Sequence, residues 1–139
     1  MRRLSVRLAL AGTAALSTAA VLSPTPANAE VGYACTSVYD GTTLVAKVCT
    51  TARGEQAGGS LNPYSGTVTA NSMKLSRCNG TGTTCTVIAE TTTLTTADVP
   101  ALPGRFYQTC ADFSVWNISM GTRAYHGCSP LVQMPSTLA

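Results

Sequence analysis

Six cysteines constrain this 139-residue chain more than any other feature of its sequence. An even number of cysteines in a short chain that leaves the cytoplasm indicates a disulfide framework. The sequence has no Cys-x-x-Cys pair and only one histidine, so we expect no metal site. We therefore expect three disulfides, formed among Cys35, Cys49, Cys78, Cys85, Cys110 and Cys128.

The first residues have the pattern of an export signal. Three arginines within the first seven residues precede an apolar run over residues 8–22, and Ala27-Asn28-Ala29 supplies a small-x-small cleavage site. The run is too short and too rich in Ala, Ser and Thr to span a membrane stably. We predict a signal peptide over residues 1–29 and a single secreted domain over residues 30–139, a typical domain size.

Removal of this segment changes the charge balance. The chain has nine Lys and Arg against six Asp and Glu, and three of the nine are Arg2, Arg3 and Arg7, which leaves six of each sign. A neutral domain lacks the basic surface that nucleic acids or anionic lipids require. We expect no nucleic-acid partner, no membrane insertion of the mature chain and no cofactor. We expect a monomer that is either free outside the cell or associated with the cell wall.

The mature chain has the composition of strands. Threonine, valine and tyrosine occur in short alternating runs, and no stretch of ten or more residues keeps a helical stripe. Six or seven strands separated by turn residues predict an all-β, antiparallel β-sandwich. The predicted strands are 31–39, 43–52, 66–78, 85–95, 105–116 and 121–132, with a possible short one near 61–64.

The cysteine spacings favour one disulfide in each hairpin. If neighbouring cysteines face each other, the hairpin tips fall at Thr81-Gly82, at Ser119 and around residues 40–43. Directly facing residues have Cα atoms about 4.5–5.5 Å apart, within the range that a disulfide accepts. Among fifteen possible connectivities, the best prediction is therefore Cys35–Cys49, Cys78–Cys85 and Cys110–Cys128. The main alternative contains a bridge between the two sheets, from Cys49 to Cys110.

One segment has a local resemblance to known domains. Residues 98–110, Asp-Val-Pro-Ala-Leu-Pro-Gly-Arg-Phe-Tyr-Gln-Thr-Cys, resemble the start of the sixth strand of immunoglobulin-like and fibronectin type III-like domains. In those families a Pro/Gly corner precedes an aromatic residue and then a cysteine or valine. The resemblance implies an immunoglobulin-like sandwich. It implies no activity, because such folds have many unrelated functions.

The hairpin register predicts one candidate catalytic pair. With Cys110 opposite Cys128, Asp112 lies opposite His126 on the strand face that we expect to point outward. A carboxylate beside a histidine can orient the imidazole for acid–base chemistry, but such pairs also occur as simple cross-strand contacts. The sequence has no hydrolase motif such as Gly-x-Ser-x-Gly. A small hydrolase that uses His126 and Asp112 is therefore only our second alternative.

Three further residues are candidates for binding. Trp116 and Phe106 can stack on a sugar or anchor a protein partner. Arg53 lies in the glycine-rich segment 51–63, which we predict to be a long exposed loop that can present the arginine to a protease. The leading prediction is a secreted, non-enzymatic binding domain for an extracellular protein or polysaccharide. The first alternative is an inhibitor of a protease or another hydrolase.

Overall fold

The computed structural model describes residues 29–136, so the predicted signal peptide up to residue 28 lies outside the described residues. The described chain consists of strands and their connections. These strands are β2 (Glu30–Val31), β3 (Tyr33–Asp40), β4 (Thr43–Arg53), β5 (Gln56–Pro63), β6 (Thr67–Cys78), β7 (Cys85–Thr91), β8 (Val99–Pro100), β9 (Phe106–Asn117), β10 (Gly121–Cys128) and β11 (Val132–Gln133). The all-β prediction is confirmed.

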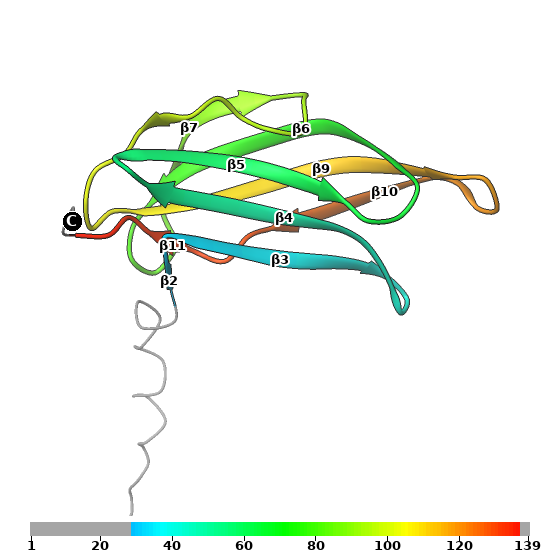
Figure 1. Ribbon diagram of the computed structural model, residues 1–139, viewed down its shortest axis with the longest axis horizontal. Helices are drawn as coiled ribbons and strands as arrows, with labels where there is room; N and C mark the ends of the chain where they lie inside the picture. Colours follow the sequence, from blue (N-terminus) through cyan, green and yellow to red (C-terminus); the bar gives the residue numbers. More distant parts are fainter. Residues whose placement is uncertain (1–28, 137–139) are drawn as a thin grey trace, which may run out of the picture.

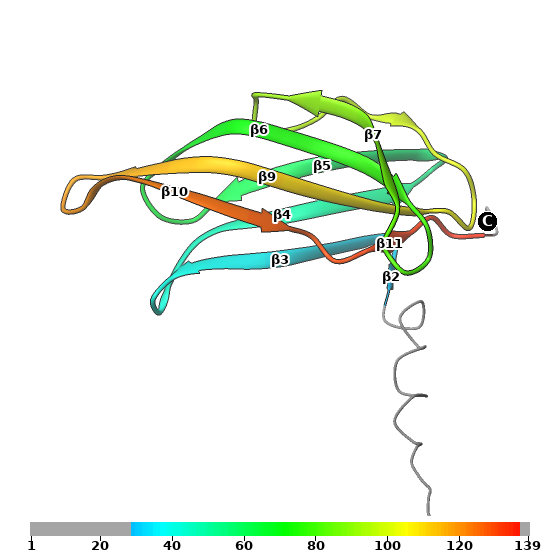
Figure 2. The same ribbon diagram turned by 180° about the vertical axis from the view of Figure 1, so that it is seen from behind.

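The strands form two sheets that pack face to face (Figure 1). One sheet has the order β7–β6–β9, and the other edge of β9 pairs with β10 over residues 110–117 and with β11 at residues 106 and 107. Short β2 lies beside β11 in the same sheet, in parallel. The second sheet has the order β3–β4–β5–β8 and is seen behind the first in Figure 2. The predicted β-sandwich is therefore confirmed.

The three predicted disulfides are also confirmed. Each joins directly facing residues of neighbouring strands within one hairpin, β3–β4, β6–β7 or β9–β10. The bridges are Cys35–Cys49, Cys78–Cys85 and Cys110–Cys128, with Cα–Cα distances of 4.1, 4.0 and 4.0 Å. No disulfide crosses between the two sheets, so noncovalent contacts hold one sheet against the other.

The hairpin tips agree with the predictions in two cases of three. The β9–β10 tip is centred on Ser119, as expected, and the β3–β4 turn lies between Asp40 and Thr43, where a register shift beside Val38 adjusts the pairing. The predicted two-residue tip at Thr81-Gly82 is wrong. Residues 80–83 form a four-residue loop, because the side chain of Asn79 accepts hydrogen bonds from the backbone N–H groups at positions 83 and 84.

The predicted strand over residues 121–132 is broken. Its first part, β10, ends at Cys128, and β11 resumes with Val132 opposite Tyr107, one residue out of the earlier register. Between them, Ser129 is buried and its N–H donates to the backbone carbonyl of Thr109 at 2.8 Å. Pro130 follows and has no N–H to donate, so it interrupts the ladder at this edge.

The prediction of a long loop over residues 51–63 is wrong. Thr51–Arg53 belongs to β4 and Gln56–Pro63 is β5, joined by a tight turn at Gly54-Glu55. A Cβ added at Gly59 would lie 2.5 Å from Thr109 Oγ1 in the facing sheet. The glycines of this segment therefore permit close approach of the strand to its neighbours, and do not indicate a mobile loop.

The interior contains two apolar clusters with a layer of hydroxyl groups between them. One cluster is centred on Phe113 and Met73, and the other on Tyr107 and Leu75. Between them, Thr109 Oγ1 lies 2.6 Å and Ser129 Oγ 2.8 Å from Thr50 Oγ1, all three side chains being buried.

The direction of these hydrogen bonds follows from their last member. The Ser129 hydroxyl donates to the carbonyl of Pro130, so Thr50 donates to Ser129 and Thr109 donates to Thr50. Each buried hydroxyl thus has an acceptor for its proton, which avoids the cost of an unpaired buried polar group. This chain of hydrogen bonds joins the two sheets at the middle of the core.

Candidate functional site

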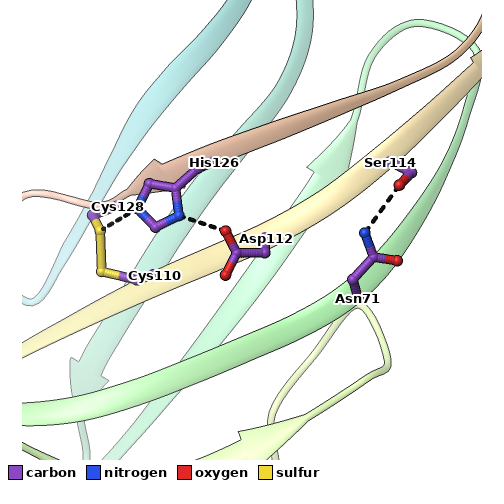
Figure 3. Close-up of polar contacts among 6 residues, drawn as sticks. All are labelled: Asn71, Cys110, Asp112, Ser114, His126 and Cys128. Atoms are coloured by element: carbon purple, nitrogen blue, oxygen red, sulfur yellow. Dashed lines mark hydrogen bonds and ion pairs between the residues drawn. A yellow bond between two sulfur atoms is a disulfide. The ribbon is translucent and has the colours of Figure 1, made fainter.

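The predicted pair of Asp112 and His126 forms on the outer face of β9 and β10 (Figure 3). The two residues face each other in the ladder, and His126 Nδ1 lies 2.7 Å from Asp112 Oδ1. Both side chains are 61% exposed. Alternate residues of β9, such as Phe113, point into the core, as the sequence predicted. The pair therefore lies on an open surface of the sheet.

The next residue along this face of β9 is a serine, and it is not hydrogen-bonded to the pair. Ser114 lies on the same face of β9, but its Oγ accepts a hydrogen bond from Asn71 Nδ2 at 2.9 Å. Within residues 29–136 no hydrogen bond joins Ser114 to His126 (Figure 3). A nucleophile activated by a histidine needs such a contact. In the described chain Ser114 is therefore not held against His126 as a nucleophile.

The three predicted binding residues lie apart from one another. Trp116 is 52% exposed near the end of β9, whereas Phe106 is half-buried at the start of the same strand. Arg53 is exposed at the end of β4, next to the β4–β5 turn. Twelve-residue β9 therefore separates the two aromatic residues, and these three side chains do not form one binding surface.

A cleft lies at one end of the sandwich, where the tips of three connections gather. These are the β3–β4 turn, the β5–β6 connection and the β9–β10 tip, on the right in Figure 1 and on the left in Figure 2. Its volume is about 370 Å³. The lining residues are Asp40, Thr43, Val45, Ser65, Val115, Asn117, Ser119, Met120, Gly121, Arg123 and Tyr125. Both sheets contribute to it, so it exists only once the sandwich has closed.

A polar cluster forms one wall of this cleft. Asp40 Oδ2 accepts a hydrogen bond from the Tyr125 hydroxyl at 2.6 Å and from Arg123 Nη1 at 2.8 Å. The Tyr125 ring stacks on Phe113 of the core, with the ring centroids 5.6 Å apart. Asp40 comes from β3 and the other two from β10, so the cluster connects the two sheets. The bonds from Tyr125 and then Arg123 lower the pKa of Asp40, and the same bond from its hydroxyl raises the pKa of Tyr125.

This cluster was not predicted from the sequence. The available signal was weak, because the side chain of Arg123 is 50% exposed and a charge so placed needs no partner. The partner, Asp40, is 83 positions away. Nothing in the spacing of the two residues relates them.

The polar cluster has an expected response to acid. Asp40 has a lower pKa in the folded protein than the ordinary value of 3.8, so its stabilising effect is complete above that value. The effect is lost only as the pH falls through the lowered pKa. Carboxyl ¹³C NMR should give a midpoint below 3.8 for Asp40, and Tyr125→Phe should raise the midpoint because it removes the main cause. A wild-type midpoint at or above 3.8 would contradict the described hydrogen bonds.

Comparisons with known proteins give no relative for this chain: no family, no curated protein and no solved structure matches it. Among the described residues no helix is long and apolar enough to cross a membrane. The same residues contain no group of three or more His, Cys, Asp or Glu side chains placed to hold a metal ion.

Proposed function

We propose that this chain is a secreted, non-enzymatic binding domain of the immunoglobulin-like type. Its ligand is a polysaccharide, a segment of which binds in the cleft at the end of the sandwich. The observation that carries the proposal is the cleft itself. It combines apolar side chains, such as Val115 and Met120, with a hydrogen-bonded cluster of fixed orientation. Apolar walls with a few fixed polar groups are typical of small-ligand sites.

The chemistry of the cleft suits a neutral ligand rich in hydroxyl groups. Asp40 offsets the charge of Arg123, and the predicted mature chain is neutral as well. Within the described residues Asp40 Oδ1 accepts no hydrogen bond, and Arg123 donates only through Nη1. The wall thus offers a free acceptor, Asp40 Oδ1, beside the free N–H donors of Arg123. This combination suits a ligand hydroxyl, because a hydroxyl group both donates and accepts hydrogen bonds.

Two further observations support the immunoglobulin-like fold and the secreted location in this proposal. The hydroxyl of Tyr107 accepts a hydrogen bond from the backbone N–H of Leu102 at 2.9 Å, like the corner tyrosine of immunoglobulin-like sandwiches. Three disulfides are compatible with an oxidising location outside the cell, which agrees with the predicted signal peptide.

The proposal is tested by sedimentation with insoluble polysaccharides, using purified peptidoglycan with its wall polysaccharide, chitin and cellulose. We expect the wild-type domain to sediment with at least one of them. Met120→Glu should reduce the bound fraction, because Met120 lines the cleft and a charge there stays hydrated. Ile118→Glu is the matched control, since Ile118 belongs to the same hairpin tip, is 88% exposed and does not line the cleft.

The outcomes separate the alternatives clearly. Equal loss of binding in both variants would place the contact on the hairpin tip and not in the cleft. The polysaccharide ligand would be ruled out if the wild-type domain bound none of the three materials. Binding to an extracellular protein would then identify a protein as the partner.

A further inference from the structure

The outer face of β9 and β10 places a histidine beside a disulfide, and the proposed polysaccharide cleft does not use this arrangement. His126 Nε2 lies 3.6 Å from Cys128 Sγ, the sulfur bonded to Cys110 (Figure 3). Both cysteines are only partly buried, so a small molecule in solution can reach the bond. The histidine and the disulfide occupy neighbouring positions on one face, because His126 and Cys128 are two residues apart on β10.

Asp112 determines the tautomer of His126 and thereby leaves a lone pair on the ring nitrogen that faces the sulfur. A carboxylate only accepts hydrogen bonds, so Nδ1 of His126 carries the proton that is donated to Asp112 Oδ1. Nε2 is therefore the nitrogen that gains or loses a proton. When the ring is protonated, its Nε2–H points at Cys128 Sγ. The protonated imidazole can therefore supply a proton to Cys128 Sγ and not to Cys110 Sγ.

A lysine lies on the other side of the same disulfide. In the ladder Lys74 of β6 faces Cys110 on one side and Glu90 of β7 on the other. Facing residues share one side of a sheet, with Cβ atoms about 4.5–5.5 Å apart. The order across the strands is therefore lysine, Cys110, Cys128. A line across the ladder from Cys128 through Cys110 therefore leads to Lys74.

We propose that Cys110–Cys128 is a site of thiol–disulfide exchange, in which a thiolate attacks Cys110 and His126 assists the departure of Cys128. The attacking thiolate approaches along the S–S axis from the Lys74 side, where the ammonium group attracts its charge. Its sulfur bonds to Cys110 Sγ as the bond between the two cysteines breaks. Cys128 leaves as a thiolate and takes the proton from His126 Nε2, which becomes neutral.

The products of this step balance. One disulfide is consumed and one is formed, a mixed disulfide between Cys110 and the incoming thiol, so the first step involves no net oxidation. A second thiolate then attacks the incoming sulfur of the mixed disulfide. This releases Cys110, leaves a reduced cysteine pair in the protein and oxidises the two small thiols to their own disulfide. The only co-reactant is a thiol, small or carried by a protein.

The other two disulfides lack this arrangement and serve as internal controls. In the described chain the polar atom against Cys85 Sγ is the carbonyl oxygen of Gly82 at 3.7 Å, which has no proton to give. At the third bridge, Cys49 is only 1% exposed, and the groups that donate to its Sγ are the amide of Asn62 at 3.1 Å and the hydroxyl of Tyr33 at 3.5 Å. Neither an amide nor a phenol is as strong an acid as an imidazolium.

The charged groups around His126 are few. Asp112 on β9 contacts it directly, and Lys74 and Glu90 lie further across the same face. Arg123 occupies an odd-numbered position of β10 and its side chain points to the opposite face, where it pairs with Asp40 of β3. The pH dependence of the exchange should therefore report mainly on the imidazole.

The experiment follows the opening of each disulfide of the intact, oxidised protein in 2-mercaptoethanol between pH 5 and 9. Samples are quenched with iodoacetamide and mapped by mass spectrometry. We expect Cys110–Cys128 to open first. Its rate, divided by the concentration of the thiolate, should fall as the pH rises, because the imidazole then no longer holds a proton for Cys128. His126→Gln, which keeps an amide N–H for Asp112, should slow the reaction about tenfold at pH 6 and remove this pH dependence.

Two further measurements keep the test decisive. His126 is 61% exposed, so we expect His126→Gln to fold like the wild type. Circular dichroism and an unchanged rate of opening at Cys78–Cys85 check this. Lys74→Glu should slow attack at Cys110 by the anionic thiolate and leave Cys78–Cys85 unaffected. The proposal is overturned if His126→Gln reacts like the wild type across the pH range, or if Cys78–Cys85 opens first with the same pH dependence.

Discussion

Reduction of all three disulfides should unfold this domain at neutral pH and room temperature. The sequence separations of the bridged pairs are 14, 7 and 18 residues, and the three closed segments do not overlap. Loop-closure entropy gives about 2.5–3 kcal/mol for each bridge, or roughly 8–9 kcal/mol together. This is comparable with the whole stability of a typical domain, about 5–15 kcal/mol.

The measurement is chemical denaturation followed by far-ultraviolet circular dichroism, with and without a phosphine reductant. Tryptophan fluorescence is a poor probe, because Trp116 is 52% exposed in the folded state. Replacement of Cys78 and Cys85 by alanine is the matched comparison, because this pair closes the shortest segment and should cost the least. A reduced protein that keeps the midpoint of the oxidised one would show that the packing of the two sheets is sufficient without the bridges.

Gly59→Ala should be the most damaging single replacement of a glycine by alanine on β5. A Cβ at this position would lie 2.5 Å from Thr109 Oγ1 and 2.7 Å from its Cγ2. Thr109 cannot turn away, because it is fully buried and its hydroxyl is hydrogen-bonded to Thr50. Overpacking of this kind costs about 1–3 kcal/mol. We expect a fall of that size in the free energy of unfolding.

Gly58→Ala is the matched control for this prediction. Here the new Cβ would meet Asp98 Oδ1 at 2.5 Å, but that atom is the end of an exposed side chain that can rotate into solvent. Alanine also reduces the conformational entropy of the unfolded chain, which favours folding by about 0.4–1 kcal/mol. The free energy of unfolding should change little. Equal losses for both variants would contradict the close contact between Gly59 and the facing sheet.

The spacing of the cysteines predicted much of this structure because strand pairing is periodic. Once one pair of facing residues is fixed, each following pair is fixed as well, until a bulge or a proline interrupts the ladder. The prediction for β9 and β10 therefore held from Cys128 to Gly121 and placed Asp112 opposite His126. It failed after Ser129, where the side chain turns into the core and Pro130 ends the ladder.

The strand β5 could not be predicted in the same way. Its sequence, Gln-Ala-Gly-Gly-Ser-Leu-Asn-Pro, is typical of a loop by composition. It forms a strand because it pairs with β4 along its whole length. Its position in the sandwich also depends on the close contact of Gly59 with Thr109 and on the hydrogen bond from Gly59 N–H to the hydroxyl of Thr96 at 2.8 Å. These partners are 50 and 37 positions away, so a local pattern contains no information about them.

The sequence by itself determined the all-β fold, the three hairpin disulfides and the pair of Asp112 and His126, since each follows from alternation and spacing within adjacent segments. Only the tertiary structure decided how the two sheets meet. The end cleft with Asp40 and Arg123, and the buried hydroxyl of Thr50, depend on contacts between segments that are distant in the chain. The six cysteines specify the strands within each hairpin, and the packing between the sheets creates the proposed binding site.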